Sequence, residues 1–353
     1  MTIPTEGVGS VPRPQYLMDA MAALQAGSLS DEDFAATVDR AVAETISEMA
    51  ATGSPIITDG EQSKSSFATY PLDGLTNLAP DGVVIPFVDG HTRQLPRLAQ
   101  GPFRYSNYSG RFVLQARSHT DLPLKQAVIA PSALSLLYPE SGLDGYDQGQ
   151  FIEDLTAECV TDIRSAFEAG AEVVQIDFTE GRLACKLDPS LGLLRQFVAL
   201  NNAVLDNFSD TERARIGIHT CPGGDHNSTH SADVDYAELL PDLFQMNAGR
   251  FYIQLASETD KPRVLDIIQH ERRSDQITFI GVTDPCDTTV ESVDTVRDRV
   301  LQAAEYLKGE RFGTTDDCGF SPFGDDVAMA RATAFDKIRT RVEATALADK
   351  KLA

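Results

Sequence analysis

The sequence predicts an α/β protein built as a single (β/α)8 barrel, or TIM barrel, over residues 1–353. From about residue 124 onward, six short apolar segments rich in β-branched residues alternate with longer stretches of helical periodicity. This alternation is typical of repeated βα units. Two further units upstream bring the expected number of strands to eight, which is the number that closes such a barrel.

The six later strands are LKQAVIA, EVVQIDF, RIGIHTC, RFYIQLA, QITFIGVTD and RFGTTDDCG. The helices that follow them are expected at roughly 149–169, 190–207, 235–248, 261–270, 291–308 and 326–347. The upstream strands are EGVGS and PIITDGE, separated by helical patterns at about 14–26 and 31–53. An open doubly wound sheet is the alternative fold. The commonest ligand motif of that fold, a GxGxxG turn, follows none of these strands.

Residues from about 71 to 123 interrupt the alternation. GVVIPFV, a DGHTRQ turn and FRYSNYSGRFVLQA favour antiparallel hairpins over another βα unit. We therefore expect one domain with a β-hairpin insertion between its second and third barrel strands. Such an insertion would lie over the mouth of the barrel as a lid or a dimer contact, and plain surface decoration is equally consistent with the pattern.

Composition narrows the class of protein. A formal charge of −23, with no basic run, opposes binding to a nucleic-acid backbone. The chain shows neither the long apolar stretch of a membrane helix nor, in MTIPTEGVGS, the features of a secretory signal, so a cytoplasmic location without a membrane partner is expected. Five cysteines, an odd number, look unlike a disulfide framework and predict thiols that are available to a metal.

The catalytic residues of a barrel enzyme lie where its strands end at their C-terminal side. The predicted strand ends carry these polar or small residues in chain order: Gly9, Ser10; Asp59, Gly60, Glu61; Asp177, Glu180; His219, Cys221; Gln254; Asp284, Cys286; Asp316, Asp317, Cys318.

A soft metal site is the first candidate among them. His219 and Cys221 stand two apart at a strand end, so both side chains leave the same face, and Cys318 ends the last strand. One imidazole and two thiolates favour zinc over magnesium or calcium, although ordinary buried thiols and a hydrogen-bonded histidine would give the same pattern. A zinc ion with three such ligands keeps a position open, for water in a hydrolase or for a substrate thiol that becomes a nucleophile. The chain has no HExxH helix, which weakens the hydrolase hypothesis.

Five motifs carry a resemblance to a known family. They are GSVPRP near the start, TDGEQ, QIDFTEG, GIHTCPGGD and RFGTTDDCGF. Together they resemble the cobalamin-independent methionine synthase family, in its short single-barrel type, which corresponds to the catalytic C-terminal barrel of the long two-barrel enzymes. The resemblance implies an S-methyltransferase that uses zinc to transfer a methyl group to the thiol of homocysteine, which forms methionine.

The resemblance also implies roles for individual residues. His219, Cys221 and Cys318 match the zinc ligands of the family, and Val8, Gly9 and Ser10 match the loop that holds homocysteine. Glu61 and Asp177 match carboxylates that pair with the amino group of that substrate, which suits an ammonium in a dry pocket. Helix capping after a strand is the alternative for these two carboxylates.

Three positions depart from the long enzymes. Where those have a glutamate as a further zinc ligand, this chain has Gln254, with Glu258 as an alternative. Where those have a proton-donating histidine, it has Asp284 and Cys286, with His226 and His230 as further candidate acids. The alternative for His226 and His230 is that they belong to a polar loop without a catalytic role, in which Asp225 or Ser228 caps the next helix.

The third departure concerns the methyl donor. The long enzymes stack the folate pterin on an indole, but this chain has no tryptophan, and a Phe or Tyr could serve instead, for instance Phe178, Phe320 or Phe323. Together with the acidity, this argues against a polyglutamylated methyltetrahydrofolate donor. The alternatives are an alkyltransferase or lyase acting on thiols of the coenzyme M type, and a methyl-transfer subunit that needs an accessory protein. A homodimer is compatible with each of them.

Overall fold

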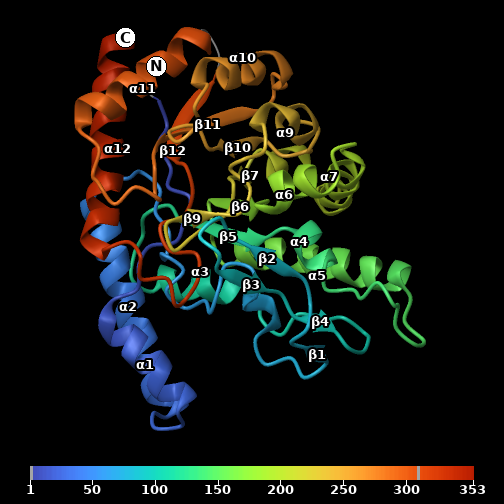
Figure 1. Cartoon of the computed structure of the whole chain (residues 1–353). Coiled ribbons are helices and arrows are strands. Elements are labelled where there is room, and N and C mark those ends of the chain that lie inside the picture. The colour runs from blue at the N-terminus through green and yellow to red at the C-terminus, as the bar shows by residue number, and fades with distance from the viewer. Residues whose placement is uncertain (1–2, 308–310) are drawn as a thin grey trace.

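The computed structural model describes residues 3–307 and 311–353 and shows the predicted barrel (Figure 1). Six strands form one parallel sheet in the order β12–β11–β10–β7–β6–β5. They are β5 (Lys125–Ile129), β6 (Val173–Asp177), β7 (Ile216–Thr220), β10 (Arg250–Ile253), β11 (Ile277–Thr283) and β12 (Phe312–Asp316). All six lie within the segments that the sequence predicts.

The two N-terminal segments complete the ring. Each joins the sheet by one parallel bridge, Thr5 to Thr314 of β12 and Ile57 to Leu124 beside β5. The two segments are also joined to each other, because Thr58 Oγ1 donates to the Gly9 carbonyl at 2.7 Å and Val11 N donates to the Gly60 carbonyl at 3.1 Å. The second segment pairs so briefly because the chain turns at Gly60, where φ is 67°.

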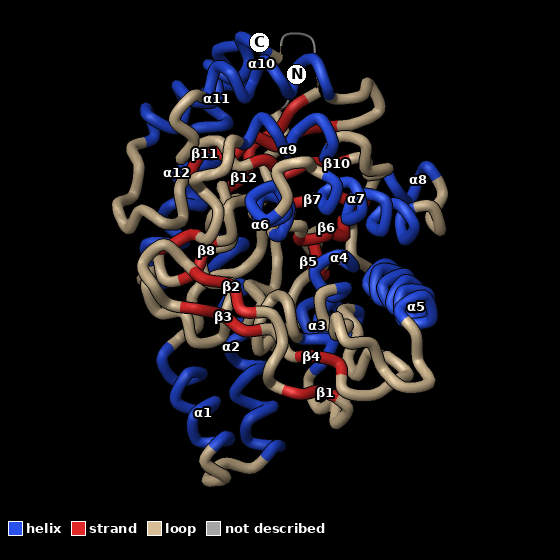
Figure 2. Tube along the Cα trace, turned by 45° about the vertical axis from the view of Figure 1, so that its right-hand side comes forward, coloured by secondary structure: helices blue, strands red, loops and turns tan. Residues whose placement is uncertain are grey.

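Helices cover the outside of the barrel (Figure 2). One follows each strand in turn: α2 (Asp31–Ala51), α3 (Gly110–Arg117), α5 (Gln148–Glu168), α7 (Gly192–Leu205), α9 (Tyr236–Leu243), α10 (Lys261–Glu271), α11 (Val293–Tyr306) and α12 (Arg331–Leu352). Shorter helices lie in the connections: α1 (Gln15–Gln25), α4 (Pro131–Ser135), α6 (Glu180–Leu187), α8 (Asp210–Arg213) and the 3-10 turn η1 (Tyr70–Leu72). Several begin at side-chain caps, such as Ser30 before α2 and Asp147 before α5. Among the described helices, none has the length and apolarity that crossing a bilayer requires.

Side chains fill the N-terminal end of the barrel. Glu6 accepts hydrogen bonds from Arg250 and from Tyr252, both at 2.6 Å, and the Lys125 ammonium lies 3.8 Å from the centre of the Tyr252 ring. Packing of this kind makes the interior of the barrel a core rather than a channel. The room for ligands is therefore at the opposite end, where the strands finish.

The insertion between the second and third barrel strands contains two antiparallel pairs, as predicted. β1 (Leu78–Ala79) pairs with β4 (Arg97–Leu98), and β2 (Val84–Pro86) pairs with β3 (Thr92–Gln94). Its edge contacts a second small hairpin, β8 (Gly224–Asp225) with β9 (Ser228–Thr229), through a Val88 N–H that donates to the Thr229 carbonyl at 3.0 Å (Figure 2).

The prediction of a further hairpin in FRYSNYSGRFVLQA was wrong. Residues Gly110–Arg117 form α3, which is the barrel helix of the second βα unit. Phe112, Val113 and Ala116 are its buried apolar face, a spacing that fits one side of a helix. This face packs between α2 and α5, and that burial favours the helix over a strand.

Candidate active site

The structure brings His219, Cys221 and Cys318 together at the C-terminal end of the barrel. His219 belongs to β7, Cys221 follows that strand directly, and Cys318 comes two residues after β12. Their ligand atoms all lie within 4.8 Å of one another, and the two sulfurs, both free thiols, are 3.0 Å apart. Strand ends that are far apart in the sequence therefore present one imidazole and two thiols to a common point.

The chemistry of this cluster fits a soft metal ion. His219 is buried, and within the described part of the chain neither of its ring nitrogens has a hydrogen-bond partner. Buried polar atoms are nearly always satisfied, so an imidazole without a hydrogen-bond partner beside two thiols fits the ligand set of a soft metal ion. The hydrogen bond with Cys221, together with burial, holds the pKa of the Cys318 thiol well above its ordinary value, so metal binding has to displace a proton.

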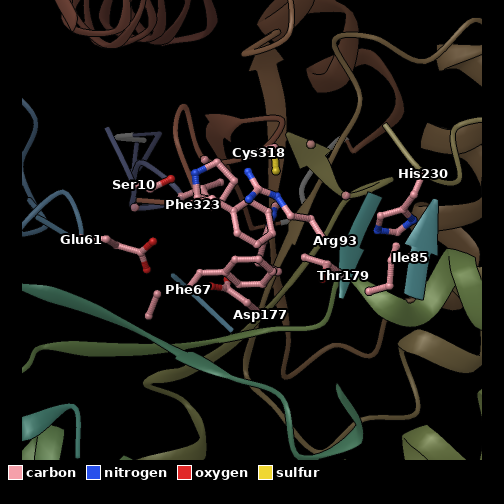
Figure 3. Close-up of a pocket in the computed structure, with 18 of the residues that line it drawn as sticks. Ser10, Glu61, Phe67, Ile85, Arg93, Asp177, Thr179, His230, Cys318 and Phe323 are labelled. Atoms are coloured by element: carbon pink, nitrogen blue, oxygen red, sulfur yellow. The ribbon is translucent and has the colours of Figure 1, made fainter. Parts of the chain in front are cut away.

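A cavity of about 590 Å³ opens beside this cluster (Figure 3). One part of its wall consists of the predicted substrate residues and two residues of the cluster: Val8, Gly9, Ser10, Glu61, Asp177, His219 and Cys318. Its remaining wall is largely apolar and carries Phe67, Ile85, Phe87, Pro322 and Phe323. In Figure 3, Ser10 and Glu61 lie on one side of the cavity and Ile85 and His230 on the other.

The two carboxylates of the cavity do not cap helices. Glu61, with φ 59°, pairs with the buried Lys64 ammonium at 2.9 Å, and Asp177 accepts a hydrogen bond from Gln175 at 2.6 Å. Burial is the main cause that raises the pKa of Asp177. Both residues are buried and line the cavity, which suits a bound ammonium group.

Comparison with known proteins decides the family. The family model described as "Cobalamin-independent synthase, Catalytic domain" matches residues 3–345. The chain belongs to the cobalamin-independent methionine synthase family. This confirms the resemblance that the motifs indicate, and it makes the protein a methyltransferase.

Individual members of the family match this chain over nearly their whole length. A methionine synthase of Saccharolobus solfataricus is 22% identical, over 99% of this chain and 96% of the relative. One of Sulfurisphaera tokodaii is 21% identical, over 99% and 94%. Among solved structures, a B12-independent methionine synthase from Shewanella sp. W3-18-1, in complex with selenomethionine, has a TM-score of 0.78 at 16% identity and covers 100% of this chain and 99% of its own. A putative one from Listeria monocytogenes has a TM-score of 0.74 at 18% identity, over 98% of each chain. These two structures confirm the barrel fold.

Both candidates for a further metal ligand are engaged elsewhere. The Gln254 amide oxygen accepts from Arg182 at 3.1 Å, and its NH2 group donates to Ser257 at 2.5 Å. Glu258 pairs with the same arginine at 2.8 Å and is not among the clustered donor atoms. Arg182 thus contacts both residues, and both line a cavity together with Cys318.

Asp284 and Cys286 line a second cavity. It also measures about 590 Å³ and adjoins the first, because Gly224 and Cys318 line both. The Cys286 N–H donates to Asp284 at 2.9 Å, and burial is the largest cause that raises the pKa of both side chains. Both side chains can therefore carry a proton at a higher pH than their exposed counterparts.

The structure separates the two candidate histidines. His226 lies in the tight turn of the β8–β9 hairpin, where it and Asn227 have φ 48° and 58°, as a type I′ turn requires, and it is not among the residues that line either cavity. His230 lines the first cavity, with its ring edge against Phe87. Burial lowers the pKa of His230 to about 4, so its imidazole is neutral at pH 7.

The loop after Cys221 has little room for side chains. A Cβ at Gly223, where φ is 71°, would lie 1.8 Å from His230 Nε2, which explains the glycine in GIHTCPGGD. The predicted cap residues serve other purposes. Asp235 caps α9, Asp225 accepts from Arg93, and Ser228 Oγ accepts from the Asp89 N–H at 3.3 Å.

Of the three predicted aromatic residues, only Phe323 lines the first cavity. Phe178 and Phe320 are buried in the apolar core. Sequence reasoning missed Phe67, Ile85 and Phe87, as well as Arg93, which lines the same wall. Three of these belong to the insertion, and no local signal in the sequence indicates how an insertion folds back onto a site.

Glu180, at the start of α6, offers a test of electrostatics beside the site. Ser132 donates a hydrogen bond to Glu180 Oε1, Oε2 has no partner among the described residues, and burial raises the pKa to about 7 from an ordinary 4.5. A raised carboxyl pKa means that the folded state binds the proton more tightly, so stability falls as pH rises from about 4.5 to 7. This difference between the folded and the unfolded pKa corresponds to a change of roughly 3 kcal/mol in the free energy of unfolding.

Glu180→Gln keeps the shape and the acceptor but removes the titration. We expect its free energy of unfolding, relative to wild type, to increase by roughly 2–3 kcal/mol between pH 5 and pH 8. Urea unfolding at both pH values measures this change. Glu153→Gln, on the exposed side of α5, is the control and should show no such trend. An advantage of Glu180→Gln that does not change with pH would contradict the argument.

Proposed function

We propose that this methyltransferase is zinc-dependent and transfers a methyl group to the thiol of homocysteine, which forms methionine. The observation that carries the proposal is that His219 and Cys318 line the same cavity as Glu61 and Asp177. A thiol and an ammonium group of one small amino acid could therefore be held at once. Membership of the family and the curated relatives named methionine synthase support the same reaction.

Ser10 and the two carboxylates bind and orient the amino acid in this proposal. Ser10 Oγ accepts from the Ser321 N–H at 3.3 Å, and its carbonyl accepts from the Phe320 N–H at 3.0 Å. The substrate loop is thereby attached to the loop that carries Cys318. Lys64 neutralises part of the charge of Glu61, and Asp177 supplies the second acceptor for the ammonium group.

His219, Cys221 and Cys318 would hold a zinc ion, which when bound lowers the pKa of a substrate thiol so that a thiolate exists at neutral pH. The protein then aligns the sulfur with the methyl group, and the apolar wall of Phe67, Phe87 and Phe323 excludes water. Alignment of two bound reactants can contribute roughly 7–11 kcal/mol to catalysis. Gln254 stays a proposed additional ligand, through an amide oxygen that also accepts from Arg182.

The proposed methyl donor lacks a long anionic tail. The cation of the first cavity wall, Arg93, already pairs with Asp225 and Asp325, and the whole chain carries −23. A polyglutamate tail would meet repulsion rather than free cations. For a leaving group that needs a proton, Asp284 and Cys286 are the proposed donors on the side of the second cavity. His230 lines the first cavity and His226 does not, but the neutral His230 imidazole is a poor proton donor at pH 7, which leaves Asp284 and Cys286 as the proposed acids.

The test is methionine formation by the purified, zinc-loaded protein. Homocysteine is supplied with the monoglutamate or the triglutamate of methyltetrahydrofolate, each with and without cell extract, and methionine is measured by mass spectrometry. We expect no advantage of the triglutamate. Activity that appears only with extract would favour a partner-dependent subunit. The cobalt-substituted protein should change its thiolate absorption with homocysteine but not with coenzyme M, and the reverse result would overturn the proposed substrate.

A further inference from the structure

One arginine of the insertion reaches both loops that carry the cluster cysteines. Arg93 lies on β3, and its guanidinium contacts two carboxylates. Nε and Nη2 donate to the two oxygens of Asp225 at 2.5 and 3.2 Å. Nη1 and Nη2 donate to the two oxygens of Asp325 at 3.0 and 2.8 Å. The planar fork of an arginine is the side chain best suited to two paired contacts of this kind.

The two carboxylates belong to the two loops of the metal cluster. Asp225 comes four residues after Cys221, and Asp325 comes seven residues after Cys318. Asp225 is fully buried at its side chain, and the guanidinium also lies 4.2 Å from the centre of the Phe323 ring. Other polar links between these loops are the 3.0 Å contact of the Cys221 and Cys318 sulfurs, a 3.3 Å hydrogen bond from Asn227 to the Ala328 carbonyl and a 3.7 Å pair of His226 with Asp326.

The Arg93 guanidinium also supplies the positive charge beside the acidic residues of the two loops. Oxygen and nitrogen atoms of Asp225, His226 and Asp326 lie close enough together to hold a metal ion. Arg93 and His91, however, already occupy the Asp225 oxygens. Burial alone would lower the pKa of Arg93, but the hydrogen bonds with Asp225 and Asp325 raise it above its ordinary value, so the charge persists. Removing it would leave a buried carboxylate without its main partner, which is costly.

We propose that Arg93 is a positioning residue, through which the insertion fixes the Cys221 and Cys318 loops in the geometry that holds the metal. The inference rests on the proposed function only in that these cysteines bind zinc. It gives the insertion a specific role, since contacts that orient the ligands of a metal site from outside influence how tightly the ion is held. Loss of such contacts elsewhere lowers metal affinity by about 10- to 100-fold.

The test measures zinc retention and thiol accessibility rather than activity. Arg93→Met is compared with Arg97→Met, which removes an exposed ion pair with Asp81 on the next strand of the same insertion. Both proteins are loaded with zinc and mixed with a chelator, and the rate of zinc release is followed. We expect Arg93→Met to release zinc at least about tenfold faster than wild type, and Arg97→Met to match wild type. Asp325→Asn, at an exposed carboxylate, should give an intermediate rate.

A second measurement uses the metal-free proteins. Alkylation of each cysteine is quantified by mass spectrometry, and Cys221 and Cys318 should react faster in Arg93→Met, while the buried Cys159 of α5 should not. Faster reaction of Cys159 as well would indicate that Arg93→Met is generally unfolded, and it would overturn the inference as drawn from that variant. The zinc release and alkylation of Asp325→Asn would then decide the role of Arg93. Equal rates of zinc release from wild type, Arg93→Met, Arg97→Met and Asp325→Asn would refute the positioning role of Arg93. If wild type binds no zinc, the proposed function fails, and the alkylation pattern still decides the role of Arg93.

Discussion

Replacing Cys221 or Cys318 by serine is expected to remove bound zinc and methyl transfer together. Each thiolate supplies one of three donors at a buried point, and the His219 ring has no other described partner there. A serine hydroxyl stays protonated and is a poor ligand for a soft ion. Because a bound metal contributes several kcal/mol to such reactions, turnover should fall by about a thousandfold or more.

Metal analysis and single-turnover methylation measure this result. Cys286→Ser is the matched control, since Cys286 also lies near Cys318 but outside the three-donor cluster. It should keep its zinc. Cys159→Ser, far from the site within α5, should keep both zinc and activity. Full turnover of a metal-free Cys221→Ser, Cys318→Ser double variant would refute the proposed chemistry, and zinc loss in Cys286→Ser would require a different ligand set.

Asp177→Asn is expected to weaken recognition of the substrate amino group. The change keeps the size of the side chain and its ability to accept from Gln175, but it removes the negative charge. A hydrogen bond between charged groups contributes about 1.5–3 kcal/mol, so kcat/KM for homocysteine should fall by roughly 10- to 150-fold. The loss should be far smaller for 4-mercaptobutyrate, which has the same thiol and carboxylate but no amino group.

The ratio of kcat/KM for the two thiols is therefore the measurement. Wild type should prefer homocysteine, and this preference should be smaller in Asp177→Asn by roughly 10- to 150-fold. Asp284→Asn, which changes a carboxylate of the second cavity, should retain the wild-type preference. An unchanged preference in Asp177→Asn would show that Asp177 does not contact the ammonium group, and a lost preference in Asp284→Asn would move the substrate to the other cavity.

The sequence by itself determined the barrel and the residues at its strand ends. Alternation of apolar strands with amphipathic helices is a local property, since each segment shows its own periodicity, and six of the eight strands were predicted with ends within three residues. In a closed parallel barrel all strands finish on the same side. Residues as distant in sequence as His219 and Cys318 could therefore be expected to meet.

Only the tertiary structure decided how the segments outside this regular pattern pack. Whether Gly110–Arg117 is a strand or a helix depends on the neighbours α2 and α5, and whether His226 or His230 faces the cavity depends on the turn of one hairpin. The contact of Arg93 with Asp225 and Asp325 spans 132 and 232 residues of chain. Contacts between segments so far apart follow from the three-dimensional arrangement of loops, which local periodicity does not encode.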